Sequence, residues 1–435
     1  MVVGRDPPAR ATLTDFLFVD AETPKAAAQA ADPSLRPAPI GLIVLLMTMS
    51  AIGPVSLNIL TPATPGLADI FGTQIETVQL TLSLYLFGLG ISQLLLGPLS
   101  DRFGRKPVLL AGLFITATAS IAAIFSTSIE MLIAFRTLQA LGASSGLVIG
   151  RAIIRDLYSR DRAASMIGLV TTVMVLAPMA APLIGGLLDE MLGKQRGWQS
   201  TFILVGTFAS VVFLWVLSLL KETRPDHITG GGVGFIARES RELFMSRSFI
   251  GYVLVCSIGT ATFFAFLGGG PHIVVSIMER TAFEYGLWFI LTSGGFMIGN
   301  FVTARNSQRY GIDRMIHFGL ICMAAGALLT VLLVALWPYD GPWTVFIPQV
   351  LMSFGNGVFL PNCVAGAVSV RPQAAGTASG IIGFTQMTVG AAAAQGMSYL
   401  IATADTAMPL AIAMVVFSAV SALCFYAFLG KRRTS

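Results

Sequence analysis

Charged residues are scarce in this sequence of 435 residues: Asp, Glu, Lys and Arg together make up 11% of it, whereas hydrophobic residues make up 55%. Soluble globular proteins carry about 25% charged residues. This composition therefore excludes a soluble globular protein. It indicates instead a chain that crosses a membrane several times.

Cysteine and histidine are rare as well, with 4 and 3 copies. The histidines are scattered over loops and ends of apolar runs. The cysteines lie within or at the edges of apolar runs and lack the spacing of metal ligands; they are Cys256, Cys322, Cys363 and Cys424. We therefore expect no metal site, and cysteines that serve as small buried hydrophobic residues.

The sequence also lacks a phosphate-binding loop of the form G-x-x-x-x-G-K-[ST], which excludes an internal ATPase as an energy source. Serine, histidine and acidic residues gather at no single place, so no catalytic site is expected. We predict that the protein is not an enzyme and needs no cofactor.

What the sequence does contain is a series of long apolar runs. Twelve windows of roughly 20 residues, the length that crosses ~30 Å of hydrocarbon as a helix, can be placed along it. They predict an all-α membrane protein with twelve transmembrane helices. The windows are 40–61, 75–97, 107–126, 129–150, 163–188, 199–220, 249–270, 284–304, 315–337, 343–366, 375–400 and 407–429.

The distribution of Lys and Arg predicts the orientation. The sequence pI of about 9.2 does not indicate a nucleic-acid partner, because the basic residues lie in short turns between windows. Most of them fall on one side of the bilayer if both termini are cytoplasmic, as the positive-inside rule requires. Residues 1–39, rich in Ala, Pro and charges of both signs, are expected to form a disordered cytoplasmic tail, and residues 431–435 a short second one.

A tight basic turn, GPLSDRFGRKP at 97–107, joins the second and third windows. Asp101 ends one helix, Gly104 can take a positive φ, and Pro107 stands where a new helix can begin. The ordered pattern G-x-x-x-D-R-x-G-R-K resembles the signature loop between the second and third spans of the major facilitator superfamily of transporters. That resemblance implies a carrier driven by a gradient.

A weak copy of this turn follows the eighth window, at 304–313. Two six-span halves related as parallel repeats are what the superfamily's architecture implies. We therefore expect one six-helix bundle over 40–220, a flexible cytoplasmic linker over 221–247 and a second six-helix bundle over 248–430. The second copy lacks the leading Asp, so weaker contacts are expected there.

One charge, Arg136, falls within a predicted span. A charge at mid-bilayer costs roughly 2.5–3.5 kcal/mol and is normally kept for a function. Alternatively, Arg136 reaches the nearby surface marked by Glu130. The run around Arg136 resembles the superfamily's fourth-span pattern, which implies a part in substrate and proton transfer. The predicted substrate or coupling residues are Arg136, Asn58, Gln139 and Tyr85.

The loop at 151–162 is dense in charges of both signs and resembles the loop after the fourth span in the Bcr/CflA drug-resistance family. That resemblance implies a cytoplasmic charge network with Asp101 and Arg102 that latches an inner gate. The predicted gate residues are Gly97, Asp101, Arg102, Gly104, Arg105, Lys106, Arg151, Arg155 and Asp156.

The fifth window contains two Ala-Pro pairs followed by Gly-Gly, a pattern that makes a pliable helix with a smooth face. It resembles the antiporter motif of drug/proton exporters, with Ala177 and Ala181 in place of glycines, and so implies export. The motif residues are Gly168, Ala177, Pro178, Ala181, Pro182, Gly185 and Gly186.

Acidic residues are missing from the predicted spans, since all 22 Asp and Glu fall in tails, loops or span ends. Bcr/CflA-like proteins usually have an Asp in the first span, where this sequence has Asn58. We expect a monomeric exporter of amphipathic drugs or metabolites, working across the inner membrane by alternating access in exchange for protons. The alternative is an importer or uniporter of a metabolite or siderophore on the same fold, without proton coupling.

Overall fold

The computed structural model describes residues 40–158, 160–224, 233–337 and 340–429, and these form helices without any strand. The first half of the chain contains α2 (Ile40–Ile59), η3 (Thr61–Ala63), α3 (Thr64–Phe71), α4 (Ile75–Phe103), α5 (Arg105–Ala123), α6 (Ile129–Ala143), α7 (Ser145–Leu157) and α8 (Arg160–Leu219). The second half contains α9 (Val233–Phe244), α10 (Arg247–His272), η4 (Ile273–Ile277), α11 (Ala282–Tyr310), α12 (Ile312–Leu336), α13 (Trp343–Ser369), η5 (Pro372–Ala374), α14 (Ala375–Ile401) and α15 (Met408–Phe428).

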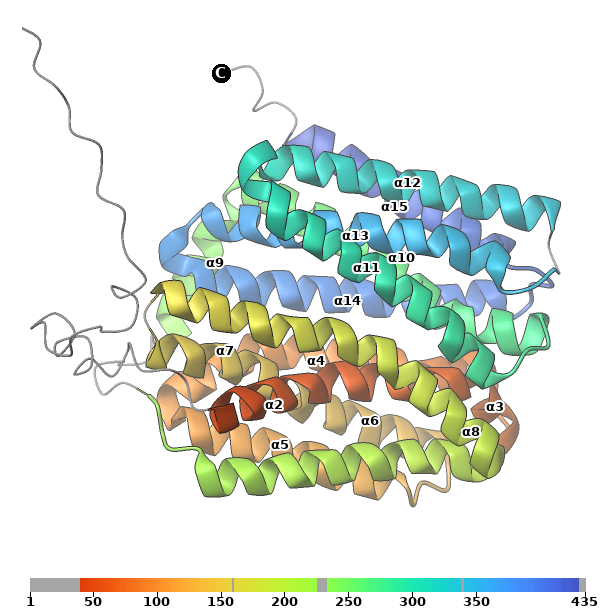
Figure 1. Ribbon diagram of the computed structural model, residues 1–435, viewed down its shortest axis with the longest axis horizontal. Coiled ribbons are helices and arrows are strands. Elements are labelled where there is room, and N and C mark those ends of the chain that lie inside the picture. Colours follow the sequence, from red (N-terminus) through yellow and green to blue (C-terminus); the bar gives the residue numbers. More distant parts are fainter. Residues whose placement is uncertain (1–39, 159, 225–232, 338–339, 430–435) are drawn as a thin grey trace, which may run out of the picture.

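The twelve predicted spans all correspond to helices. Within the described ranges, ten helical segments are long and apolar enough to cross a membrane. That set counts α8 once, although Gly193 interrupts it with a φ of 76° and the chain reverses there (Figure 1). It also leaves out α14, which covers the window at 375–400. The fold class predicted from the sequence, an all-α membrane protein, is therefore confirmed.

The helices form two bundles that lie side by side (Figure 1). In the first bundle α2 packs on α8, and α5 packs on α6 and α8. In the second bundle α13 packs on α11 and α12, and α10 packs on α14 and α15. The most extensive contacts between the bundles are those of α4 with α14 and of α8 with α11.

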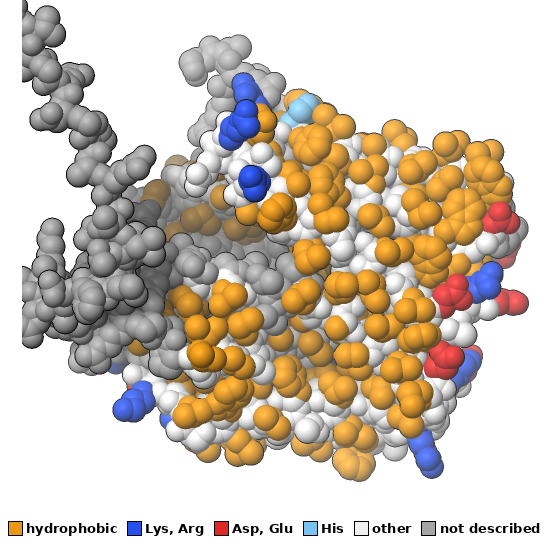
Figure 2. Space-filling model, viewed as in Figure 1, with side chains coloured by type: hydrophobic (Ala, Val, Ile, Leu, Met, Phe, Trp, Pro, Cys, Tyr) orange, Lys and Arg blue, Asp and Glu red, His pale blue; other side chains and the backbone are white. Residues whose placement is uncertain are grey.

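The surface of both bundles is apolar. Large exposed hydrophobic side chains include Phe114, Leu214, Phe301 and Leu423, each more than half exposed. Hydrophobic side chains cover the visible face across both bundles, while charged side chains gather at its two ends (Figure 2). Such an extended apolar surface is suited to lipid rather than to water.

The internal repeat seen in the sequence extends to the backbone. Helices α4 and α11 are each 29 residues long, and each ends at a glycine, Gly104 with φ 102° or Gly311 with φ 83°. Both glycines also start the next helix. We call the end of the molecule that carries these two glycines the motif end, and the opposite end, which carries α3, the α3 end.

A helix occupies part of the segment predicted to be a flexible linker, which corrects that prediction. Helix α9 covers residues 233–244, and its Leu243 is fully buried. Glu242 pairs with Arg238 one turn away and with Arg371 beyond α13. The pair with Arg371 and the buried Leu243 hold the helix against the second bundle. The predicted tails, 1–39 and 431–435, lie outside the described residues.

Candidate functional site

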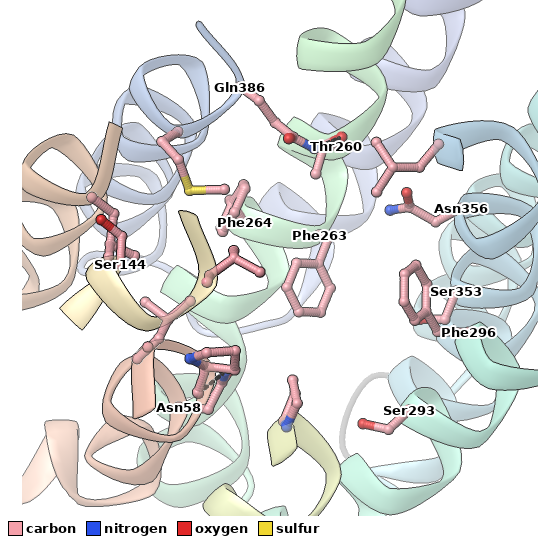
Figure 3. Close-up of a pocket in the computed structure, with 18 of the residues that line it drawn as sticks. Asn58, Ser144, Thr260, Phe263, Phe264, Ser293, Phe296, Ser353, Asn356 and Gln386 are labelled. Carbon is pink, nitrogen blue, oxygen red and sulfur yellow. Dashed lines mark hydrogen bonds between the residues drawn. The ribbon is translucent and has the colours of Figure 1, made fainter. Parts of the chain in front are cut away.

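A central cavity of about 290 Å³ lies between the two bundles. Its walls come from α2, α4, α6, α7 and α8 on one side and from α10, α11, α13 and α14 on the other. Figure 3 shows side chains from both bundles converging on this space. Its volume is at the small end of the range of pockets that bind drug-sized molecules.

The walls of the cavity are apolar with uncharged polar groups set into them. Among the described residues that line it, none is Asp, Glu, Lys, Arg or His. The stretch of α8 from residue 163 to 188 also contains no charged residue in its sequence. The polar lining residues are Asn58, Gln93, Ser144, Thr260, Thr292, Ser293, Ser353, Asn356 and Gln386.

Aromatic rings form one part of the wall. Phe263 lies 5.6 Å from Phe264 and 6.4 Å from Phe289, measured between ring centroids. Phe296 lines the cavity from the same helix as Phe289. Such rings provide flat apolar surfaces against which another ring can stack.

Asn58 is placed on the cavity wall by α2, one turn after Pro54, the proline within that helix. Its side chain is 2% exposed, and its Nδ2 donates a hydrogen bond of 2.8 Å to the carbonyl of Pro54. Its Oδ1 is buried and accepts no hydrogen bond from the described residues. Asn58 therefore contributes a neutral carboxamide to the cavity, with unused hydrogen-bonding capacity.

The other three predicted substrate or coupling residues meet inside the first bundle. Arg136 is 2% exposed, and its Nη1 donates to the carbonyl of Ser56 at 2.9 Å and to Oε1 of Gln139 at 2.6 Å. Its guanidinium lies 4.1 Å from the centroid of the Tyr85 ring. Tyr85 in turn donates to the carbonyl of Gly53, a cavity residue, at 3.4 Å.

Arg136 thus lies behind the cavity wall rather than in it, and it does not reach the surface near Glu130. No carboxylate of the described chain pairs with Arg136. A buried ion without a counter-ion costs several kcal/mol, of which a desolvated ring face returns about 2 kcal/mol or somewhat more. Holding this cation without a carboxylate is costly, which indicates that the residue is kept for a purpose other than stability.

Arg105 is the centre of a charge network at the motif end. It is 5% exposed, and its Nε bonds Asp156 at 2.9 Å while its Nη1 bonds Asp101 at 2.5 Å and the Ser100 hydroxyl at 2.7 Å. We call these four residues the Arg105 network. It ties the end of α4 and the start of α5 to the end of α7.

Arg102 and Arg155, which the resemblance to the Bcr/CflA family implied in this network, do not join it. Arg102 is exposed, with its guanidinium 5.2 Å from the Phe103 ring. Within the described part of the chain, neither Arg102, Arg151 nor Arg155 forms an ion pair. The difference arises because Gly104 turns the chain so that Arg105 points inward.

Glu222, which follows α8, binds the turn at Gly104 through hydrogen bonds. This role was not predicted from the sequence. The Glu222 carboxylate accepts four backbone N–H groups, those of Arg105, Lys106, Thr223 and Arg224. Burial alone would raise the pKa of the Glu222 carboxyl, but these hydrogen bonds hold it below its usual value. One feature of the sequence pointed to such a partner. Gly104 has no side chain that could cap the start of α5, so the free N–H groups of the first turn need an acceptor from elsewhere in the chain.

Two more basic side chains secure this turn. Lys106 donates from Nζ to the carbonyl of Leu217 at 3.0 Å. Arg224, also missed from the sequence, donates from Nη1 to the carbonyl of Arg102 at 2.7 Å. At Gly97, near the end of α4, an added Cβ would meet nothing within 4 Å.

The small residues of the predicted antiporter motif let α8 approach both α2 and α11. A Cβ on Gly185 would collide with the carbonyl of Ile59, and one on Gly186 would lie 2.4 Å from the carbonyl of Ala282. Ala177, Ala181 and Pro182 are buried as well, and Pro178 lines the cavity. The surroundings of Gly168 lie outside the described part of the structure.

The bundles are joined by hydrogen bonds at the α3 end. Gln395 of α14 accepts from the Ser83 hydroxyl at 3.0 Å and donates to the carbonyl of Glu76 at 2.9 Å, both in α4. Among the described side chains, these are the hydrogen bonds that cross from one bundle to the other. The bundles are therefore held together on the α3 side of the cavity.

Comparison with known proteins agrees with this arrangement. The model of the family described as Major Facilitator Superfamily matches residues 44–395. Multidrug resistance protein D of Escherichia coli (strain K12) is 29% identical over 352 residues, which cover 80% of this chain and 86% of that protein. The Bicyclomycin resistance protein homolog of Haemophilus influenzae is 27% identical over 394 residues, covering 90% and 96%.

A Chloramphenicol resistance protein of Pseudomonas aeruginosa is 29% identical over 336 residues, covering 77% of this chain and 76% of that protein. Among solved structures, the xylose transporter XylE of E. coli in a partially occluded inward-open conformation superposes with a TM-score of 0.69. It is 12% identical and covers 90% of this chain and 97% of its own. At that identity the likeness concerns the fold alone.

Proposed function

Because this chain belongs to the Major Facilitator Superfamily, we propose that it exports amphipathic small molecules, drugs or related metabolites, by alternating access in exchange for protons. The observation that carries the proposal is the central cavity, which both bundles line with apolar, aromatic and uncharged polar side chains. A cavity at the contact between two such bundles can open to either side as they rock. Relatives named for resistance to several drugs, to bicyclomycin and to chloramphenicol support export.

The motif end faces the cytoplasm in this proposal. Basic residues gather there, with Arg102, Arg105 and Lys106 in one turn and Arg309 and Arg314 in its repeat. Lys and Arg concentrate on the cytoplasmic side of inner-membrane proteins. Both termini then lie in the cytoplasm, since an even number of spans separates them.

Alternating access assigns roles to the two ends of the cavity. Gln395, with its bonds to Ser83 and Glu76, closes the periplasmic side in the conformation described. For release to the outside these bonds must break and the motif ends of the bundles must approach. The Arg105 network lies where that closure would take place.

Accumulation of radiolabelled chloramphenicol in cells that lack their own exporters tests the proposal. Cells that express this protein should hold less of the drug at steady state than cells that express the Ser293→Phe variant, whose added ring would occupy the cavity. Equal accumulation in both, at equal amounts of protein in the membrane, would contradict chloramphenicol export through this cavity.

One observation favours a second candidate, transport without proton exchange. The described cavity wall carries no carboxylate, and Asn58 cannot take up or release a proton. Collapse of the proton gradient with an uncoupler separates the two candidates. Proton-coupled export is abolished by the uncoupler, whereas an importer or uniporter continues to equilibrate its substrate across the membrane.

A further inference from the structure

The lack of charge in the central cavity restricts which molecules it can hold. No described lining residue is charged, and Asn58 and Asn356 contribute carboxamides from opposite bundles. We propose that the cavity binds electrically neutral aromatic molecules carrying hydroxyl or amide groups in preference to lipophilic cations. This inference rests on the proposed export function, for which it names the class of substrate.

Four of the nine polar residues that line the cavity lie on the wall built by α11 and α13. Figure 3 shows Ser293, Ser353 and Asn356 on that side, across the cavity from Asn58. Asn356 is 6% exposed, and its Oδ1 is buried without a hydrogen-bond partner in the described chain. Since unpaired buried polar groups are costly, a ligand that supplies donors and acceptors here gains affinity.

The aromatic part of the wall adjoins this polar part, since Phe296 comes from α11 and lies beside Ser353 (Figure 3). Phe263 packs edge-on against Phe264 and lies next to Phe289, so the rings form a connected apolar surface. A ligand with a ring at one end and hydroxyl or amide groups at the other would satisfy both surfaces at once.

A cationic ligand finds no compensating charge among the described residues that line this cavity. The buried charge beside the wall is itself a cation: Arg136 bonds the carbonyl of Ser56, two residues before Asn58. A ligand cation would lose its hydration and approach a like charge. Phenylalanine rings attract cations, but less strongly than desolvation penalises them.

Direct binding to the purified full-length protein in nanodiscs tests the proposal. The probes are chloramphenicol, its N-acetyl analogue, and the primary amine left when the dichloroacetyl group is removed. The two amides are neutral and the amine is protonated at pH 7, while all three share the nitrophenyl ring and both hydroxyls. The acetyl analogue is closer in size to the amine than chloramphenicol is, which reduces the effect of size in the comparison of charge.

We expect the two amides to bind with similar affinity and the amine to bind at least about tenfold more weakly, since its charge has no partner in the cavity. Equal binding of the amine and the acetyl analogue would overturn the proposal. Tighter binding of the anionic hemisuccinate ester of chloramphenicol than of chloramphenicol itself would also overturn it.

A single substitution should reverse the preference. Asn58→Asp places a carboxylate on the wall and should raise the affinity for the amine relative to the acetyl analogue by about tenfold. Asn300→Asp is the matched control, because Asn300 also donates from Nδ2 to the carbonyl four residues earlier, at 2.9 Å, but does not line the cavity. An equal shift in both variants would show that general surface charge, not the cavity, sets the preference.

The outcomes separate this inference from the export proposal. If the amides bind preferentially but are not transported, the inference stands and export fails. If the amine binds and is exported as well as the amides, export stands and the inference fails. If none of the probes binds, the neutral aromatic class proposed here is wrong, and transport assays judge export separately.

Discussion

The turn at Gly104 and its repeat at Gly311 share a backbone but not an electrostatic design. Both follow a helix of 29 residues and have nearly the same φ and ψ, 102° and 153° against 83° and 156°. Arg102 lies 5.2 Å from the ring of Phe103, and Arg309 lies 5.3 Å from the ring of Tyr310. The local sequence therefore sets the same turn twice.

The difference lies in the residue after each glycine. In the first bundle it is Arg105, buried with two carboxylates, and in the second it is Ile312, packed against an apolar cluster. Asp101 likewise has Gln308 as its counterpart. The glycine therefore determines the turn, whereas the Arg105 network is an addition found in the first bundle.

Replacing the buried arginine should have the largest effect. Arg105→Ala leaves Asp156 buried without its partner, which should destabilise the first bundle by about 3 kcal/mol. The counterpart Ile312→Ala removes only part of a half-buried apolar side chain and should cost about 1 kcal/mol. Melting temperatures of the two variants in detergent check this order, and a larger loss at Ile312 would refute it.

Replacing Gly104 or Gly311 with alanine should have the next largest effect on stability, and the two losses should differ. Both positions have backbone angles that only glycine adopts readily, so each substitution should cost about 1–3 kcal/mol. A Cβ at residue 104 would also lie 2.7 Å from Oε2 of Glu222, whereas one at residue 311 would meet nothing within 4 Å. Gly104→Ala should therefore lower the melting temperature more, and equal losses would show that the Glu222 contact contributes nothing.

Asp101→Asn should impair transport without preventing insertion. The carboxylate is 37% exposed and Arg105 keeps Asp156, so the stability loss should be about 1 kcal/mol or less. Gln308→Leu, at the position of the repeat, is the control. Transport rates at equal membrane levels check the prediction, and a normal rate for Asp101→Asn would remove Asp101 from the mechanism.

Glu222→Gln should have the smallest effect and should depend on pH. The pKa of Glu222 is lowered in the folded protein, so its contribution is present above the unfolded value of about 4.3 and is lost as the pH falls through the folded value. At pH 7 the variant should be less stable by about 0.3–1 kcal/mol, the usual size of a charge at a helix N-terminus. Melting curves of both proteins should converge only once the pH falls below the lowered folded pKa of Glu222, and a difference that grows on acidification would contradict this assignment.

The sequence predicted features that depend on local chemistry. Apolar runs predicted the spans, the glycine-containing turn predicted the break at Gly104, and small residues predicted a smooth face on α8. Each of these follows from residues close together in the chain. The same reasoning identified Arg136 as unusual, because its cost depends only on its presence within a span.

The features that sequence reasoning missed depend on contacts between distant segments. Glu222 meets Arg105 across 117 residues, and Gln395 meets Glu76 across 319. No pattern of neighbouring residues in the sequence predicts such pairs. Whether Arg136 faces the cavity or lies behind Tyr85 is likewise set by helix rotation, which a nearly all-apolar span does not reveal. Helix α9 was missed because its stabilising partner, Arg371, is remote in sequence.

The central claim is that neutral molecules leave the cell through the cavity between the bundles. The most direct test is uptake of radiolabelled chloramphenicol into inverted inner-membrane vesicles that contain the wild-type protein or Ser293→Phe. The account predicts accumulation with the wild-type protein and its loss when the cavity is filled. Accumulation that is unchanged by the added ring, or absent in both, would contradict it.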